Sequence, residues 1–274
     1  MNKKIVILVM VLSACLGLGF FLAQNFSEIS NTENDFPQED TIFAEKESAQ
    51  NIESLNQNLQ SDIQLKSETV EVLPIKENIK LDVPFIVQAP LGNWSDPVFQ
   101  NACEESSIVM AMGWVNGAKT ISSQAAMEQI NNIVKFENET FGYNADTDMS
   151  DVEKIFKQYF NHQNVTVKED VMIEDIVNEL QYGNLLIAPV FGQALGNPFF
   201  TSPGPIAHML VVIGYDGESK EFITNDPGTK RGADYRYDEK VLFEAIWEYP
   251  SGKGPIETPV KGGIEKTVLI IKPK

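Results

Sequence analysis

The pattern of apolar and polar residues divides the chain into three parts. Residues 5–23 form an uninterrupted apolar run, residues 24–80 are mostly polar, and apolar residues recur at short intervals through residues 81–274. Nineteen uncharged residues are about the length of a helix that crosses a bilayer. The recurring apolar positions of the third part predict the elements of one globular domain.

Helical periodicity predicts several helices in the first half of that domain. Apolar side chains share one face in residues 104–115, which predicts a buried helix. The stretches "SSQAAMEQINNIV" and "SDVEKIFKQYF" have the pattern of amphipathic helices, with Ser122 and Ser150 as candidate N-caps. The stretch "IEDIVNELQYG" predicts a further helix that stops at Gly183.

The periodicity then changes to that of strands. Short β-rich runs bounded by turn residues are "NLLIAPVF", "AHMLVVIGYD", "EFITND" and "KTVLIIK". Near the start of the domain, "LDVPFIVQAP" is predicted as a short strand or extended segment, and the later "GADYRYDEK" as a polar connection. Helices followed by strands indicate an α+β fold, with an antiparallel sheet packed against helices.

Composition sets the middle part apart from the domain. Residues 24–80 contain twelve acidic and four basic residues and no glycine, which predicts a solvated, extended and disordered tether. The whole chain carries a formal charge of −18. This charge argues against nucleic acid as a partner, because phosphates would be repelled, and disfavours electrostatic binding to an anionic membrane surface.

The N-terminal run predicts a membrane anchor or signal segment over residues 1–23. Lys3 and Lys4 precede it and no basic cluster follows it, so the positive-inside rule places the rest of the chain outside the cytoplasm. A cleaved signal peptide, which would make the protein secreted, is an alternative. A second alternative is a lipoprotein, because "LSAC" resembles a bacterial lipoprotein box and would leave Cys15 acylated.

The domain contains one thiol, Cys103, within "PVFQNACEESSIVMAMGWV". The other cysteine, Cys15, lies in the apolar run, so the two are not expected to pair. Cys103 is therefore either a small buried apolar residue or a nucleophile at a helix N-terminus, where free N–H groups favour a thiolate. Glu104 and Glu105 suit a first helical turn, and we expect them to be structural and to face away from the sulfur.

The chain has two histidines. His162 lies in a polar turn and is expected to be exposed. His208 lies at the entrance to an apolar strand, where its ring nitrogens need partners. If that strand pairs with the run before "NDPG", Asp226 or Asn225 would lie beside His208 and could fix its tautomer.

Two further features concern a possible cleft. Trp94 either lines a cleft or pins a loop to the core. Residues 192–207 are rich in glycine and proline and precede His208 directly, so they form either a mobile cleft wall or an ordinary connection. Two histidines are too few for a histidine-rich metal site, and we expect no metal and no cofactor.

In chain order, "VPFIVQAP", "QNACEESS", "AHMLVVIGYD" and "ITNDPG" resemble the peptidase C39-like family of papain-like cysteine peptidases, over about residues 81–274. The resemblance implies a papain-like fold in which an N-terminal helix bearing the cysteine packs on a C-terminal antiparallel sheet. It also implies Cys103 as nucleophile, His208 as general base and acid, and Asp226 as the residue that orients the imidazole. Gln88 stands where the family has its oxyanion donor, with Gln100 as the alternative.

Together these features predict a membrane-tethered, extracytoplasmic cysteine peptidase or amidase. It would act on a peptide or protein substrate through an acyl-enzyme. An acyltransferase on the same fold is one alternative. The other is a non-catalytic module that binds a peptide or a cell-wall fragment, in which case the pKa of Cys103 would be close to or above that of a free thiol.

Overall fold

The computed structural model describes residues 78–252, 256–259 and 265–274. The predicted anchor, Cys15 and all but the last three residues of the predicted tether lie outside the described residues. Within the described part, every helix is too short or too polar to cross a membrane.

A seven-stranded antiparallel sheet forms the centre of the domain. Its strands are β1 (Asn78–Lys80), β2 (Val165–Lys168), β3 (Leu185–Phe191), β4 (Ala207–Asp216), β5 (Glu221–Asn225), β6 (Tyr235–Asp238) and β7 (Val268–Ile271). The order across the sheet is β2-β7-β3-β4-β5-β6, and β1 pairs with the C-terminal part of β4. The last three residues of the predicted tether, Asn78–Lys80, thus form the first strand of the domain.

Both faces of the sheet are buried. Along β4, Met209 and Val211 belong to one hydrophobic cluster, whereas Leu210 and Val212 belong to the other. The alternation follows from the strand geometry, which points successive side chains to opposite faces. It explains why β3, β4 and β7 are nearly continuous apolar runs in the sequence.

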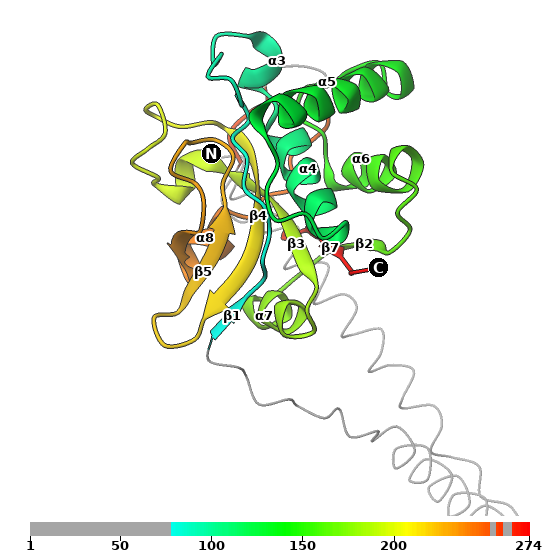
Figure 1. Ribbon diagram of the computed structural model, residues 1–274. Helices are drawn as coiled ribbons and strands as arrows, with labels where there is room; N and C mark the ends of the chain where they lie inside the picture. The colour runs from blue at the N-terminus through cyan, green and yellow to red at the C-terminus, as the bar shows by residue number, and fades with distance from the viewer. Residues whose placement is uncertain (1–77, 253–255, 260–264) are drawn as a thin grey trace, which may run out of the picture. The chain divides into compact units, whose positions relative to one another are not determined.

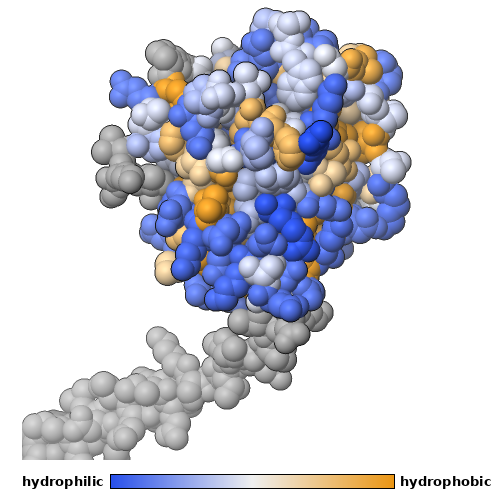
Figure 2. Space-filling model, turned by 90° about the vertical axis from the view of Figure 1, so that its left-hand side faces the viewer, coloured by the Kyte–Doolittle hydropathy of each residue, from blue (hydrophilic) through white to orange (hydrophobic). Residues whose placement is uncertain are grey.

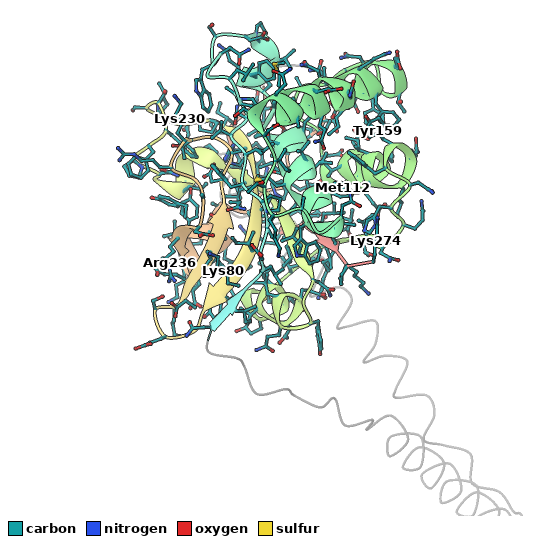
Figure 3. All side chains as sticks on the ribbon, in the orientation of Figure 1. Lys80, Met112, Tyr159, Lys230, Arg236 and Lys274 are labelled. Atoms are coloured by element: carbon teal, nitrogen blue, oxygen red, sulfur yellow. The ribbon has the colours of Figure 1, made fainter. Side chains whose placement is uncertain are left out.

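Helices cover both faces (Figure 1). They are α3 (Pro97–Gln100), α4 (Cys103–Val115), α5 (Ser123–Thr140), α6 (Met149–Lys154), α7 (Ile173–Gln181) and α8 (Glu239–Ala245). The cluster on one face includes residues of α4, α5 and α6, and the cluster on the other includes residues of α7 and α8. Figure 3 shows side chains filling the layer between α4 and the sheet, with Met112 on α4.

The predicted α+β class, with the cysteine-bearing helix packed on an antiparallel sheet, is confirmed. The four predicted helical segments and the four β-rich runs form helices and strands, but the second half of "SDVEKIFKQYF" continues from α6 as a π-helix, η1 (Ile155–Tyr159). Ser122 caps α5 as predicted, because its side chain accepts a hydrogen bond from the backbone N–H of Ala125. At Gly183, which follows α7, the backbone takes a φ of 80°, as expected of a helix stop.

Three local predictions are wrong. Asp148, not Ser150, caps α6, because its carboxylate accepts from the backbone N–H of Asp151. The stretch "GADYRYDEK" is not a polar connection, because it contains β6 and the first residues of α8. Of the two alternatives for "LDVPFIVQAP", the strand is not formed. His162 is buried, not exposed, since the chain folds back after α6 and its ring packs 6.3 Å from that of Phe156.

The surface of the domain combines hydrophilic residues, exposed ion pairs and some apolar residues. The face shown in Figure 2 is largely hydrophilic, and apolar residues gather around its middle. Arg236 of β6 contacts the carboxylates of Asp216 and Glu221 at 2.9 and 3.1 Å, near the end of the sheet where Figure 3 also places Lys80. Most of the ion pairs of the described part are similarly exposed, and each contributes little to stability.

Candidate active site

Cys103 is the first residue of α4, with Ala102 at the N-cap position. Its side chain is buried, and Sγ donates a hydrogen bond to Oε2 of Glu104 at 3.0 Å. The other oxygen of Glu104, Oε1, accepts a hydrogen bond from the hydroxyl of Tyr249 at 2.7 Å. The expectation that Glu104 faces away from the sulfur is therefore wrong, because Tyr249 holds this carboxylate inside the domain beside the thiol.

The surroundings of Cys103 favour the neutral thiol. Burial raises the pKa of Cys103 well above its ordinary value, and the charges of Glu104 and Glu105 raise it further. The backbone N–H of Met209 opposes these effects only in part. In this state the N-terminus of α4 does not make the sulfur a thiolate.

His208 and Asp226 form a buried pair. His208 is the second residue of β4, and Asp226 follows the last residue of β5. Because these strands are antiparallel neighbours, the start of β4 meets the end of β5, and Nε2 of His208 lies 2.8 Å from Oδ1 of Asp226. The predicted proximity of the two is confirmed. Asn225, the other candidate, instead donates its amide to the carbonyl of Val83.

The second oxygen of Asp226 is held by two residues that the sequence did not single out. Oδ2 accepts a hydrogen bond from the hydroxyl of Tyr237 at 2.7 Å and a longer one, 3.5 Å, from the amide of Asn197. Burial raises the pKa of Asp226, but His208, Tyr237 and the N–H of Gly228 outweigh it and bring the pKa below its usual value. Asp226 is thus maintained as a carboxylate beside the ring of His208.

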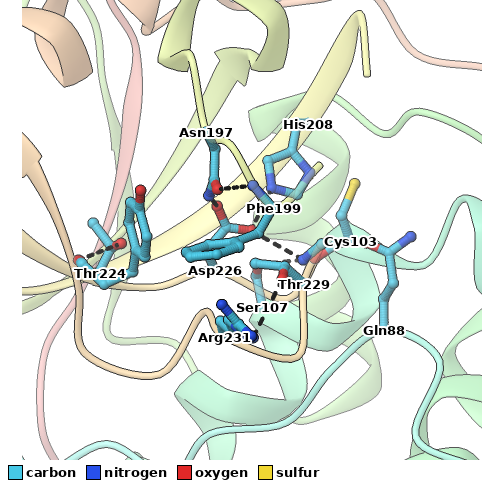
Figure 4. A network of polar contacts seen from close by, with 12 residues as sticks. Gln88, Cys103, Ser107, Asn197, Phe199, His208, Thr224, Asp226, Thr229 and Arg231 are labelled. Atoms are coloured by element: carbon cyan, nitrogen blue, oxygen red, sulfur yellow. Dashed lines mark hydrogen bonds and ion pairs between the residues drawn. The ribbon is translucent and has the colours of Figure 1, made fainter. Parts of the chain in front are cut away.

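Figure 4 shows how these side chains lie: Cys103 and Gln88 are on one side of His208, and Asp226 with Asn197 is on the other. Since Nε2 is bonded to Asp226, Nδ1 is the nitrogen left for the thiol. The ring of Phe200 meets the imidazole edge-on, with 5.2 Å between centroids. Gly228 lies so close that a Cβ there would be 2.8 Å from Cε1 of His208. The imidazole is therefore tightly held.

Gln88 is buried and ties the chain before α4 together. Its Nε2 donates to the backbone oxygens of Phe99 and Gln100, at 3.0 and 2.9 Å, so both amide hydrogens are engaged. Its backbone N–H donates to the oxygen of Pro227, next to Asp226. Residues 89–96 loop out between Gln88 and α3, as the spacing to Cys103 requires. The side chain of Gln100 is largely exposed at the edge of the site.

A cleft of about 650 Å³ opens over these residues. Its lining consists of Gln88, Trp94, Gln100, Asn101, Cys103, Asp146, Phe200, Thr201, Pro205, Ile206, Ala207, His208, Gly228 and Ile256. Trp94 thus lines the cleft and also packs against the core, so that both interpretations of it hold. Residues 200–207 supply a wall, as one interpretation of the glycine- and proline-rich segment predicted. Asp146 was not identified by any motif.

Across the described ranges, no group of three or more His, Cys, Asp and Glu side chains is arranged to hold a metal ion. His162 is not among the residues that line the cleft, and burial lowers its pKa.

Much of this chain is similar to known proteins. The model of the Peptidase_C39 like family matches residues 80–254. A crystal structure of a candidate C39-like peptidase from Bacillus anthracis has 18% sequence identity and a TM-score of 0.46, covering 72% of this chain and 98% of its own. Xylellain, a cysteine protease from Xylella fastidiosa, has 12% identity and a TM-score of 0.36, covering 76% and 90%. No curated protein matches the sequence.

Proposed function

Because the chain belongs to the Peptidase_C39 like family, we propose that it is a cysteine peptidase or amidase with Cys103, His208 and Asp226 as its catalytic triad. The observation that carries the proposal is the buried His208–Asp226 pair, in which Nε2 lies 2.8 Å from Oδ1, beside a cleft that both His208 and Cys103 line. A thiol, a base and a residue that orients the base are the groups that nucleophilic acyl transfer needs.

The reaction follows from these positions. Nδ1 of His208 takes the proton of Sγ, and the thiolate attacks the substrate carbonyl carbon to give a tetrahedral oxyanion. When the C–N bond breaks, the imidazolium gives its proton to the leaving amine, and the acyl group remains as a thioester on Cys103. Water then attacks the thioester, loses a proton to His208 and releases the carboxylic acid, while the sulfur regains its proton. Asp226 stabilises the imidazolium throughout.

Two contacts of the resting structure must change for this reaction. The thiol must exchange its hydrogen bond to Glu104 for one to His208. For the oxyanion, the backbone N–H of Cys103 is one donor, since the first residue of a helix has no acceptor within it. Gln88 is the proposed second donor, and it serves once it releases the carbonyl oxygen of Phe99 or Gln100.

We further propose that the domain works outside the cytoplasm, tethered to the membrane by residues 1–23. Lys3, Lys4 and the apolar run support this orientation. If residues 24–77 act as the proposed tether, a flexible chain of that length would span roughly 40 Å, a reach that suits substrates near the membrane. Protease added to intact cells or spheroplasts should degrade the domain; the proposed orientation is wrong if a domain that is protease-sensitive when purified resists until the membrane is permeabilised.

A non-catalytic binding module is the second candidate, and one observation favours it. The raised pKa of Cys103 is what a structural thiol would show, whereas an ion-paired nucleophile would have a lowered pKa. Such a module would bind a peptide or wall fragment in the same cleft. An acyltransferase would use the same triad but pass the acyl group to an amine in place of water.

One experiment separates these functions. The full chain, in a Cys15→Ala background so that labelling reports on Cys103, is incubated with an iodoacetamide probe and separately with a mixed peptide library, with and without an added amine. Library cleavage that disappears in Cys103→Ala and His208→Ala supports the peptidase. Products that carry the added amine identify an acyltransferase. Peptide binding without cleavage, and labelling unaffected by His208→Ala, would identify a binding module.

A further inference from the structure

Asp146 is the one acidic side chain that lines the described part of the cleft, and no lysine or arginine lines it. It lies in the connection between α5 and α6, far in sequence from the triad. Its carboxylate is close enough to Glu104 for its charge to raise the pKa of that residue. The negative charge is therefore near the nucleophile's end of the cleft, where a substrate's residues flank the scissile bond.

The backbone holds Asp146 in place. Its φ is 51°, in the left-handed region that non-glycine residues seldom adopt, and its carbonyl oxygen accepts a hydrogen bond from the backbone N–H of Gly252 at 2.8 Å. The neighbouring Ser251 accepts from the backbone N–H of Asp148 and donates to Asp151 at 2.6 Å. Two segments about a hundred residues apart thus fix the position of this carboxylate.

Within the described residues, the carboxylate of Asp146 makes no hydrogen bond and no ion pair, although it is half-buried. A partly desolvated charge without a partner is unfavourable, and a cation from a ligand would relieve this cost. Burial accordingly raises the pKa of Asp146. The cleft also offers the apolar side chains of Trp94, Phe200 and Ile256, which suit the aliphatic stem of a long cationic side chain.

We propose that Asp146 is a specificity-determining residue that selects substrates with a cationic side chain, an amine or guanidinium, next to the scissile bond. The ammonium or guanidinium group pairs with the Asp146 carboxylate, and its methylene stem packs against the apolar walls. The chain's charge of −18 favours the approach of such substrates. This inference rests on the proposed function, because only an enzyme has a substrate. The binding of a cationic side chain by Asp146, however, does not require catalysis.

The test therefore measures binding and cleavage separately. Capped hexapeptide mixtures carry Lys, Arg, norleucine or Glu at one fixed position and random residues elsewhere. Their binding to the full-length Cys103→Ala protein is measured by fluorescence anisotropy, with and without Asp146→Asn. Asparagine keeps the size and tolerates the left-handed backbone. Asp170→Asn is the matched control, because Asp170 has the same φ of 51° but is exposed and lies outside the cleft.

At one fixed position, Lys and Arg mixtures should bind about tenfold more tightly than norleucine mixtures, the change expected for one charge-assisted contact. Asp146→Asn should abolish this preference, and Asp170→Asn should retain it. Absence of a basic preference, a preference that survives Asp146→Asn, or no binding of any mixture would overturn the inference. A further outcome separates the two proposals. If the mixtures with Lys or Arg bind selectively but the protein that retains Cys103 cleaves none of them, the peptidase proposal is refuted and the binding role of Asp146 stands.

Discussion

Sγ of Cys103 donates a hydrogen bond to Oε2 of Glu104 at 3.0 Å, within a buried part of the site. The contact keeps the thiol protonated and occupied at the position from which it would attack. Because Tyr249 holds the other oxygen of Glu104, the carboxylate cannot turn away without losing a second hydrogen bond. Reactivity of the thiol therefore depends on a residue beside it as well as on His208.

Glu104→Gln should make Cys103 more reactive. The amide keeps an acceptor for Tyr249 but removes the charge that raises the pKa of the thiol. Below the thiol pKa, alkylation should quicken by about tenfold for each unit by which that pKa falls. The measurement is the rate of iodoacetamide labelling of Cys103 between pH 6 and 10.

Glu139→Gln serves as the control, since Glu139 is exposed on α5 and does not contribute to the pKa shift of Cys103. A labelling profile that is the same in Glu104→Gln and the parent protein would mean that Glu104 does not restrain the thiol.

Tyr237→Phe should weaken the triad through Asp226. The hydroxyl of Tyr237 donates to Oδ2 of Asp226 and helps to lower its pKa, so its removal should cost about 1–3 kcal/mol, as for a buried hydrogen bond to a charged group. A lowered carboxyl pKa contributes stability above the unfolded-state value of about 3.9, and that stability disappears as pH falls through the folded-state pKa. The loss in Tyr237→Phe should be full at neutral pH and shrink in acid.

Urea unfolding at pH 7 and at pH 3 measures that difference. Tyr235→Phe is the matched control on the same strand, because its ring packs against that of Tyr237 while its hydroxyl makes no hydrogen bond to Asp226. Equal losses in the two variants at both pH values would argue against a specific role for Tyr237.

Burial and strand pairing decide which strands and site residues could be predicted from the sequence. Strands β3, β4 and β7 were predictable because they are buried on both faces and so are continuously apolar. Strand β6 was missed because Arg236 and Asp238 are exposed, which gives an edge strand the composition of a loop. His208 and Asp226 were predictable because strand pairing brings them together.

Glu104, Tyr237 and Asp146 depend on contacts that no local pattern records. The carboxylate of Glu104 bonds to Tyr249, 145 residues away, as well as to the thiol of Cys103. Asp146 lines the cleft, and its carbonyl oxygen accepts a hydrogen bond from the backbone N–H of Gly252, more than a hundred residues later in the chain. The residues next to Glu104 and Asp146 in the sequence are those of an ordinary helix start and an ordinary polar turn. They carry no information about these distant contacts.

Gly228→Ala should displace His208. A Cβ at this position would lie 2.8 Å from Cε1 of His208 and 3.0 Å from Cε1 of Phe200, so the imidazole would have to move from its place between Asp226 and the thiol. We expect cleavage of the peptide library to fall at least about tenfold, mainly in kcat, because misplacing a catalytic group by a fraction of an ångström lowers reactivity.

Gly117→Ala is a useful comparison for that variant. Its φ of 74° makes alanine strained there, but a Cβ would meet no atom within 4 Å. It should lower stability without lowering cleavage. If Gly228→Ala retains full activity, His208 does not need the position that it has in this structure.

The stability of the domain should fall as pH rises from about 5 to 8, and Glu137 should be a cause. Glu137 lies on the buried face of α5, close to Glu105 of α4, and burial raises its pKa to about 8. The folded state therefore binds this proton more tightly than the unfolded state, whose glutamate pKa is about 4.3. Stability from a raised carboxyl pKa is complete below the unfolded-state value and is lost as pH rises through the folded-state value.

Glu137→Gln should flatten this decline and raise Tm at pH 8 by at least about 2 °C. Glu139→Gln, at an exposed position of the same helix, should have neither effect. Thermal unfolding at pH 5, 6, 7 and 8 measures both, and a Tm that declines as steeply in Glu137→Gln as in the parent would show that Glu137 is not titrating in this range.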